Sequence, residues 1–152
     1  IKSNLLSGFQ YLHFATHGIV DQVNPASSQL FLNAANQEDG NLYAGEIYNL
    51  TLNSNLAVLS ACQTGLGKVS KGEGVMGLSR ALVYAGAKNL IVSFWSVADE
   101  STAQLMTDFY TNLLRAKDQN FKQALRQSKL KMISDEKYAA PYFWAPFVLI
   151  GK

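Results

Sequence analysis

Cysteine, histidine and charged residues are all scarce in this chain of 152 residues. The single cysteine, Cys62, excludes an internal disulfide, and one cysteine with two histidines offers few ligands for a zinc site. Lys and Arg number 13 against 11 Asp and Glu, so the net charge of +2 is far from the concentrated positive charge of nucleic-acid-binding proteins. We therefore expect no bound metal and no nucleic-acid partner.

Long apolar runs are missing as well. No run reaches the roughly 18 residues that a membrane span needs, and residues 1–8 lack the charged head and long apolar stretch of a signal peptide. Together with the single cysteine, this predicts a cytoplasmic protein that does not enter the membrane. The chain starts at Ile1 rather than Met and soon reaches an apolar segment, so we expect further sequence to precede it.

Apolar residues, in contrast, are abundant, at 48% against 16% charged residues. This composition is typical of a globular protein with a packed core. The length is close to that of one ordinary domain. We therefore expect a single domain over residues 1–152.

Short apolar runs alternate with amphipathic segments along the chain. Four runs predict strands: residues 11–15, 56–59, 90–95 and 147–150. A hairpin is expected around residues 30–32 and 42–43, with Asp39 and Gly40 in its turn.

Helical spacing of apolar residues predicts three helices. The first covers residues 74–85 and ends at Gly86, the second has Asp99 as its N-cap, and the third is marked by Phe121, Leu125 and Met132. The basic face of the third helix is expected to be solvated. Strands that alternate with helices indicate an α/β fold with a mostly parallel sheet.

The only cysteine and one histidine follow two of the expected strands. His17 comes after the first strand and Cys62 after the second, and parallel strands bring their carboxyl ends to one edge of the sheet, where ligands bind. A thiol with a pKa near 8.5 is mostly protonated at neutral pH, so an imidazole that takes its proton makes it a nucleophile. The alternative stays open that Cys62 is a small buried apolar residue and His17 an ordinary loop histidine.

Four stretches of the sequence together resemble the CHAT family of caspase-like domains. They are HFATHG (13–18), LSACQTGLG (59–67), GEGVMGLSRALVYAGAKNLIVSFWSVADE (72–100) and YFWAPFVLIG (142–151). The resemblance spans nearly the whole chain and implies a cysteine endopeptidase that acts on a protein or peptide substrate. Cys62 would be the nucleophile, His17 the general acid and base, and the backbone N–H groups of Gly18 and Cys62 the oxyanion hole.

The resemblance also implies an architecture and a second possible function. The fold would be a caspase-like three-layer sandwich with a six-stranded sheet, of which two strands would lie upstream of Ile1. Members of the family often follow tetratricopeptide-type helical repeats, so such an upstream region or a regulatory partner is expected. The alternative function is a latent or inactive interaction and signalling module coupled to that region.

Substrate specificity is expected to reside in the loop FWSVADE (94–100), which resembles a loop of separases. In separases, acidic residues there help to bind a basic side chain before the scissile bond. This chain has Ser96 directly after the loop Trp and an acid at Asp99, which makes both candidates for substrate binding. For Asp99, helix capping remains an alternative. Gln63-Thr64-Gly65 stands where caspases have Arg-Gly, so no preference for Asp before the cut is expected.

Other short matches lack the context that their chemistry needs. GEGVMG (72–77) matches a dinucleotide-binding pattern, but Gly72 comes twelve positions after Ser60, too far for a tight turn onto a pyrophosphate. The chain around Lys68 lacks the glycine and hydroxyl residue of a P-loop, and Phe14 replaces the Glu of a zinc-protease helix. GLSRA (77–81) imitates a serine-hydrolase elbow within an expected helix. We therefore expect no cofactor.

Overall fold

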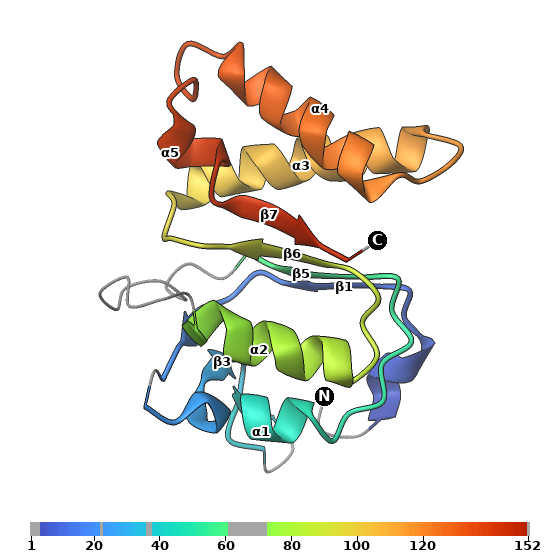
Figure 1. Cartoon of the computed structure of the whole chain (residues 1–152), viewed down its shortest axis with the longest axis vertical. Coiled ribbons are helices and arrows are strands. Elements are labelled where there is room, and N and C mark those ends of the chain that lie inside the picture. The colour runs from blue at the N-terminus through green and yellow to red at the C-terminus, as the bar shows by residue number, and fades with distance from the viewer. Residues whose placement is uncertain (1–3, 22, 36–37, 61–72, 152) are drawn as a thin grey trace. The chain divides into compact units, whose positions relative to one another are not determined.

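The structure is a computed structural model that describes residues 4–21, 23–35, 38–60 and 73–151. The chain forms two compact units, one of residues 1–96 with 150–152 and one of residues 97–149. The first unit contains the parallel strands that precede the candidate site, and the second contains the two longest helices of the described residues (Figure 1).

A parallel sheet forms the centre of the first unit. Its strands β1 (Tyr11–Phe14), β5 (Leu56–Leu59) and β6 (Leu90–Ser93) lie in the order β1-β5-β6, and both pairings are parallel. Every residue of β5 and β6 is buried, which explains why their sequences are continuous apolar runs rather than alternating ones. The three predicted strands are thereby confirmed, with β6 ending two residues earlier than expected.

Helix α2 (Glu73–Tyr84) connects β5 to β6, as the apolar spacing predicts. It buries Leu78, Ala81 and Leu82 in a hydrophobic core that also includes residues of β1, β5 and β6. The helix ends before Gly86, whose φ of +112° suits glycine and few other residues. A Cβ at this position would collide with the carbonyl oxygen of Leu52, so glycine is required by space as well as by conformation.

An antiparallel sheet accompanies the parallel one within the first unit. It contains β2 (Gly18–Ile19), β3 (Gln29–Phe31) and β4 (Asn41–Tyr43) in that order. The predicted hairpin is therefore confirmed as β3 and β4, and Gly40 has the positive φ of +80° that the turn requires. Strand β2 is an addition that the sequence did not reveal. The short helices η1 (Asn4–Gly8), η2 (Pro25–Ser27) and α1 (Ala44–Ile47) complete the elements before β5.

The second unit consists mainly of α3 (Asp99–Arg115), α4 (Phe121–Ile133) and α5 (Pro141–Trp144). Helices α3 and α4 pack against each other through buried apolar faces. The buried residues include Leu105, Phe109, Leu113, Leu125 and Met132. Polar contacts join the two helices as well, since the Lys131 ammonium lies 2.6 Å from the Asp108 carboxylate.

Strand β7 (Phe147–Ile150) follows α5, as predicted. The described elements form an α/β protein with a mostly parallel sheet, consistent with the caspase-like sandwich that the sequence indicates. In the described part of the chain, no helix combines the length and the apolar character that crossing a membrane requires.

Candidate active site

The two strands that lead to His17 and Cys62 end side by side. Residues from Tyr11 to Phe14 pair in parallel with Leu56 to Leu59, so Phe14 and Leu59 lie opposite each other. The pairing extends one residue further, because the Ser60 N–H donates to the Phe14 carbonyl at 3.2 Å. The loops after β1 and β5 therefore start from the same edge of the sheet. Cys62 itself lies in residues 61–72, outside the described residues.

His17 is exposed and its backbone is held by a neighbouring strand. Its carbonyl accepts a hydrogen bond from the N–H of Phe31 at 2.8 Å, and the Thr16 hydroxyl donates to the Phe31 carbonyl. These bonds fix the main chain at the point where the chain passes from β1 to β2. An exposed imidazole on an anchored backbone is suited to accept or donate a proton at a defined place.

Gly18, the proposed oxyanion-hole residue after His17, is buried and opens β2 opposite Leu30. His17 and Phe31, the preceding pair in this register, are joined by a ladder hydrogen bond. Directly opposed residues of antiparallel strands alternate between hydrogen-bonded and non-hydrogen-bonded pairs. Gly18 consequently occupies a non-hydrogen-bonded position, and its N–H is directed away from β3.

A hydrogen bond between His13 and Ser60 was not foreseen from the sequence. The Nε2 atom of His13 on β1 lies 2.8 Å from the Oγ atom of Ser60, the first residue after β5. Desolvation lowers the pKa of His13, so the neutral imidazole is favoured. The sequence drew attention to His13 only through its spacing from His17. The parallel register that brings it to a serine 47 residues away is a property of the folded chain.

The loop after β6 carries the candidate specificity residue Ser96. The buried Ser93 hydroxyl donates to the carbonyl of Trp95 at 2.6 Å and thereby holds the turn that follows the strand. Phe94 and Trp95 are exposed, and Ser96 is partly exposed at the end of the first unit. This arrangement presents aromatic surface after a carboxyl end of the parallel sheet.

Asp99, the second candidate specificity residue, is the first residue of α3 rather than its N-cap. The N-cap is Ala98, whose ψ of 139° is extended, and its side chain makes no capping hydrogen bond. The predicted cap at Asp99 is therefore wrong by one position, because the chain becomes helical one residue earlier than its polar side chain suggests. Asp99 is exposed, and a carboxylate in the first helical turn is still favourable toward the helix dipole. Ser96 and Asp99 belong to different compact units.

The short matches to dinucleotide-binding and serine-hydrolase motifs fall mostly within helix α2. Gly74, Gly77 and Ser79 lie inside α2, and Ser79 is buried, as expected for a helical rather than an elbow position. Gly72 is outside the described residues. Within the described ranges, no three His, Cys, Asp or Glu side chains gather into a group that could hold a metal ion.

The chain is similar to one protein family and to two known proteins. A family model described as CHAT domain matches residues 1–152. Tetratricopeptide repeat protein 28 of Homo sapiens is 33% identical over 110 residues, which cover 72% of this chain and 4% of the relative. The protein of the same name from Mus musculus is 31% identical over 110 residues, with the same coverage of 72% and 4%. The chain thus matches only a small part of these long relatives.

Proposed function

The chain belongs to the CHAT domain family, and we propose that it is a cysteine endopeptidase of the caspase-like type that hydrolyses peptide bonds in protein substrates. One observation carries the proposal: β1 and β5 are paired up to Phe14 and Leu59, and His17 and Cys62 each follow three residues later. Equal spacing from paired strand ends brings two loops to one edge of the sheet. A thiol and an imidazole on such loops suit nucleophilic catalysis.

The proposed reaction uses this chain's own groups in two steps. His17 takes the proton of the Cys62 thiol, and the sulfur bonds to the carbonyl carbon of the scissile peptide. The backbone N–H groups of Gly18 and Cys62 stabilise the oxyanion, and the direction of the Gly18 N–H away from β3 supports its part in this role. The C–N bond then breaks as His17 protonates the leaving amine, and water hydrolyses the thioester to restore the thiol.

Specificity is assigned to the loop that leads from β6 into α3. We infer that Asp99 receives a basic side chain of the substrate and that Ser96 contributes to substrate binding, as the resemblance to the separase loop implies. Asp99 is exposed, so its carboxylate is accessible to a charged ligand. A carboxylate opposite a guanidinium forms a charge-assisted and often bidentate hydrogen bond, which favours Arg and disfavours Asp before the cut.

A second candidate function is an interaction or signalling module of the same fold without turnover. The similarity to tetratricopeptide repeat protein 28 favours it, because that name describes a repeat protein. In this case an upstream tetratricopeptide-type region would bind a partner and the caspase-like domain would transmit the event. In either case we place the protein in the cytoplasm.

A cleavage screen distinguishes the two functions. The full-length chain is incubated with a library of internally quenched peptides, alongside Cys62→Ala, His17→Ala and the control Thr107→Ala at an exposed position of α3. The peptidase function predicts cleavage by the parent chain, its loss in Cys62→Ala and His17→Ala, and its retention in Thr107→Ala. Cleavage that persists in Cys62→Ala, or no cleavage by the parent chain at all, would favour the interaction module.

A further inference from the structure

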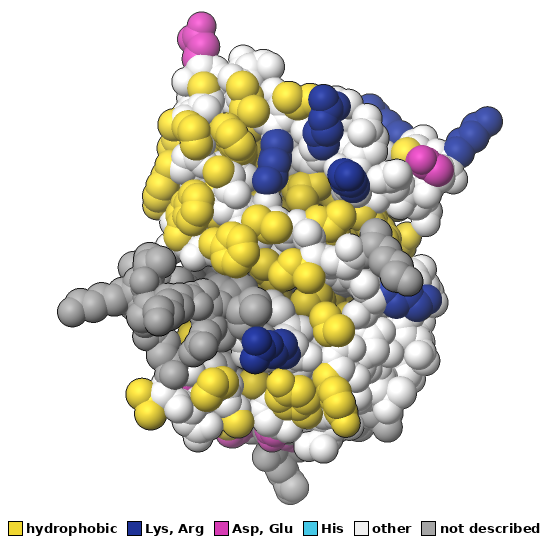
Figure 2. All heavy atoms as spheres, in the orientation of Figure 1, with side chains coloured by type: hydrophobic (Ala, Val, Ile, Leu, Met, Phe, Trp, Pro, Cys, Tyr) yellow, Lys and Arg dark blue, Asp and Glu magenta, His cyan; other side chains and the backbone are white. Residues whose placement is uncertain are grey.

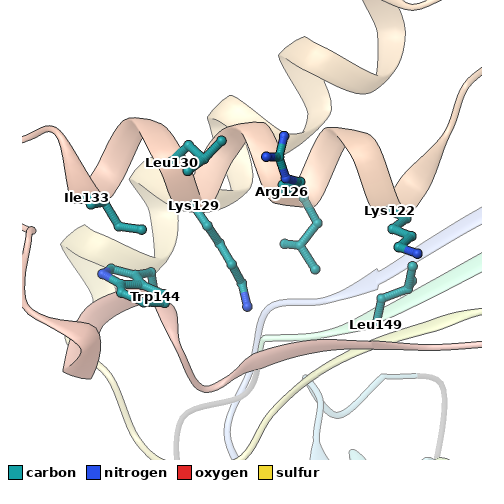
Figure 3. A pocket seen from close by; sticks show the side chains of 8 residues that line it. Lys122, Arg126, Lys129, Leu130, Ile133, Trp144 and Leu149 are labelled. Atoms are coloured by element: carbon teal, nitrogen blue, oxygen red, sulfur yellow. The ribbon is translucent and has the colours of Figure 1, made fainter.

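A pocket of about 320 Å³ lies within the second unit, between α4 and the segment that contains α5 and β7 (Figure 3). Five of its lining residues are apolar: Leu125, Leu130, Ile133, Trp144 and Leu149. The other three are basic: Lys122, Arg126 and Lys129. None of these eight residues belongs to the candidate active site.

The apolar wall of the pocket is only partly covered by the protein. Leu130 and Ile133 are 40% and 42% exposed, whereas the packed side of α4 buries Leu125 and Met132. The Trp144 indole is held in place, since its N–H donates to the Ala139 carbonyl at 3.0 Å. Large apolar side chains around a hollow that is open to water form the type of surface that a ligand's apolar group covers.

The cations of the pocket come from one stripe of α4. This helix contains four basic residues and no acidic ones. Lys131 is paired with Asp108, but in the part of the chain that the structure describes, Lys122, Arg126 and Lys129 make no ion pair. Because they are spaced at i, i+4 and i+7, they share one helix face and span about 10 Å along the axis.

Most of the basic face of α4 is exposed, as the sequence predicts, but Lys129 is an exception. Lys129 is half-buried, and Figure 3 shows its side chain extending from α4 into the pocket while Lys122 lies beside Leu149. Burial lowers the pKa of Lys129, which is the direction expected for a cation that has lost water and gained no anion. Figure 2 shows dark blue Lys and Arg side chains among yellow hydrophobic ones where Figure 1 draws α4.

We propose that this pocket binds an acidic segment of a partner protein, which inserts one large apolar side chain beside Ile133 and Trp144 and places carboxylates opposite the stripe Lys122, Arg126 and Lys129. Charge complementarity identifies the occupant, since three cations at adjacent turns repel one another until anions separate them. The apolar majority of the lining favours a protein segment over a nucleic acid, whose phosphates need cations but no apolar cavity. The proposal does not depend on peptidase activity.

Binding is tested by fluorescence anisotropy with the full-length chain. The probe is a labelled peptide of twelve residues in which one central Leu is flanked on both sides by Asp and Glu. Two matched peptides replace the Leu by Ser or all acidic residues by Asn and Gln. We expect saturable, salt-sensitive binding of the first peptide and at least a tenfold weaker affinity for each control. A single-stranded oligonucleotide and anionic vesicles serve as competitors.

Variants of the chain locate the binding site. The double variant Lys122→Glu with Lys129→Glu is expected to abolish binding of the acidic peptide. The single variant Lys129→Met keeps the apolar part of the side chain and is expected to weaken binding about tenfold. Lys117→Glu, at an exposed position outside the pocket, is the matched control and leaves affinity unchanged. Equal binding of all three peptides, affinity that survives the double charge reversal with thermal melting unchanged, or complete displacement by the oligonucleotide would overturn the proposal.

A second readout comes from the pocket itself. The chain has two tryptophans, so Trp95→Phe leaves Trp144 as the single indole. Insertion of the peptide's Leu beside Trp144 is expected to shift its emission to shorter wavelength. The acidic peptide that carries Ser in place of Leu gives no such shift. An unchanged spectrum at saturating peptide would place the binding elsewhere on the chain and contradict the proposal.

Discussion

The imidazole of His13 and the hydroxyl of Ser60 are joined by a hydrogen bond of 2.8 Å that connects β1 with the first residue after β5. Ser60 precedes Cys62 by two residues, so this bond fixes the beginning of the segment that carries the proposed nucleophile. The backbone hydrogen bond from the Ser60 N–H to the Phe14 carbonyl holds the same residue against β1. The two contacts define where the loop after β5 starts.

Removing this side-chain bond should reduce stability. Ser60 is buried, so Ser60→Ala loses a hydrogen bond and leaves the imidazole without this partner, at a cost of about 1 kcal/mol in the free energy of unfolding. Urea denaturation followed by circular dichroism measures the change. Thr107→Ala, at an exposed position of α3, is the control and is expected to change stability little. An identical urea midpoint for Ser60→Ala and the parent would show that the bond contributes nothing.

The pKa of His13 predicts how stability depends on pH. Desolvation lowers this pKa in the folded chain, so at mildly acidic pH the unfolded chain binds more protons than the folded one. The stabilising contribution is complete above the unfolded pKa of about 6.5. This contribution to the free energy of unfolding is lost as the pH falls below the unfolded-state pKa toward the lower folded-state pKa of His13. Urea midpoints measured between pH 7.5 and pH 5 should decline less steeply in His13→Gln, and parallel curves would argue against this assignment.

The reactivity of Cys62 tests the catalytic assignment directly. If His17 stabilises the thiolate form of Cys62, a larger fraction of this thiol is deprotonated at pH 7 than in glutathione. Cys62 should therefore react with iodoacetamide about tenfold faster than glutathione does. His17→Ala should bring the rate back toward that of glutathione. Because Cys62 is the only cysteine, Cys62→Ser removes all labelling and sets the background in mass spectrometry. A rate equal to that of glutathione in the parent chain would contradict activation.

The turn after α2 should tolerate no side chain at position 86. Gly86→Ala places a Cβ against the Leu52 carbonyl at a φ of +112°, with an expected loss of about 1–3 kcal/mol of unfolding free energy. Gly8→Ala is the matched control, because a Cβ there meets no atom within 4 Å. Thermal melting of both variants gives the comparison. Equal melting temperatures would show that the turn adapts.

The specificity proposal predicts cleavage after a basic residue. A peptide library should be cut after Arg or Lys, and Asp99→Asn should reduce that preference at least tenfold while the melting temperature changes little. Glu100→Gln is the matched control on the same helical turn; its carboxylate is already paired with Lys137 at 2.7 Å. Cleavage after Leu or Met in the parent chain would exclude the acidic pocket and leave the roles of His17 and Cys62 intact.

The main helices and strands of this protein can be predicted from its sequence. The apolar runs of β5 and β6 and the helical spacing in α2, α3 and α4 are properties of neighbouring residues, so they predict strands and helices without knowledge of the fold. The order of strands and helices likewise predicted a parallel sheet, and with it one common edge for the loops of His17 and Cys62. The positions of Cys62 and its backbone N–H stay predictions, since they lie outside the described residues.

The contacts between residues far apart in the chain depend on how the elements pack, which the sequence pattern does not predict. Strand β2 is only two residues long and pairs with β3, so no periodic pattern in the sequence could predict it. His13 meets Ser60 because of the register between β1 and β5, and Lys129 is half-buried because α5 and β7 line the pocket beside α4. Local periodicity states which face of an element is apolar. Which groups that face meets, and how much water they lose, depends on the packing of segments far apart in the chain.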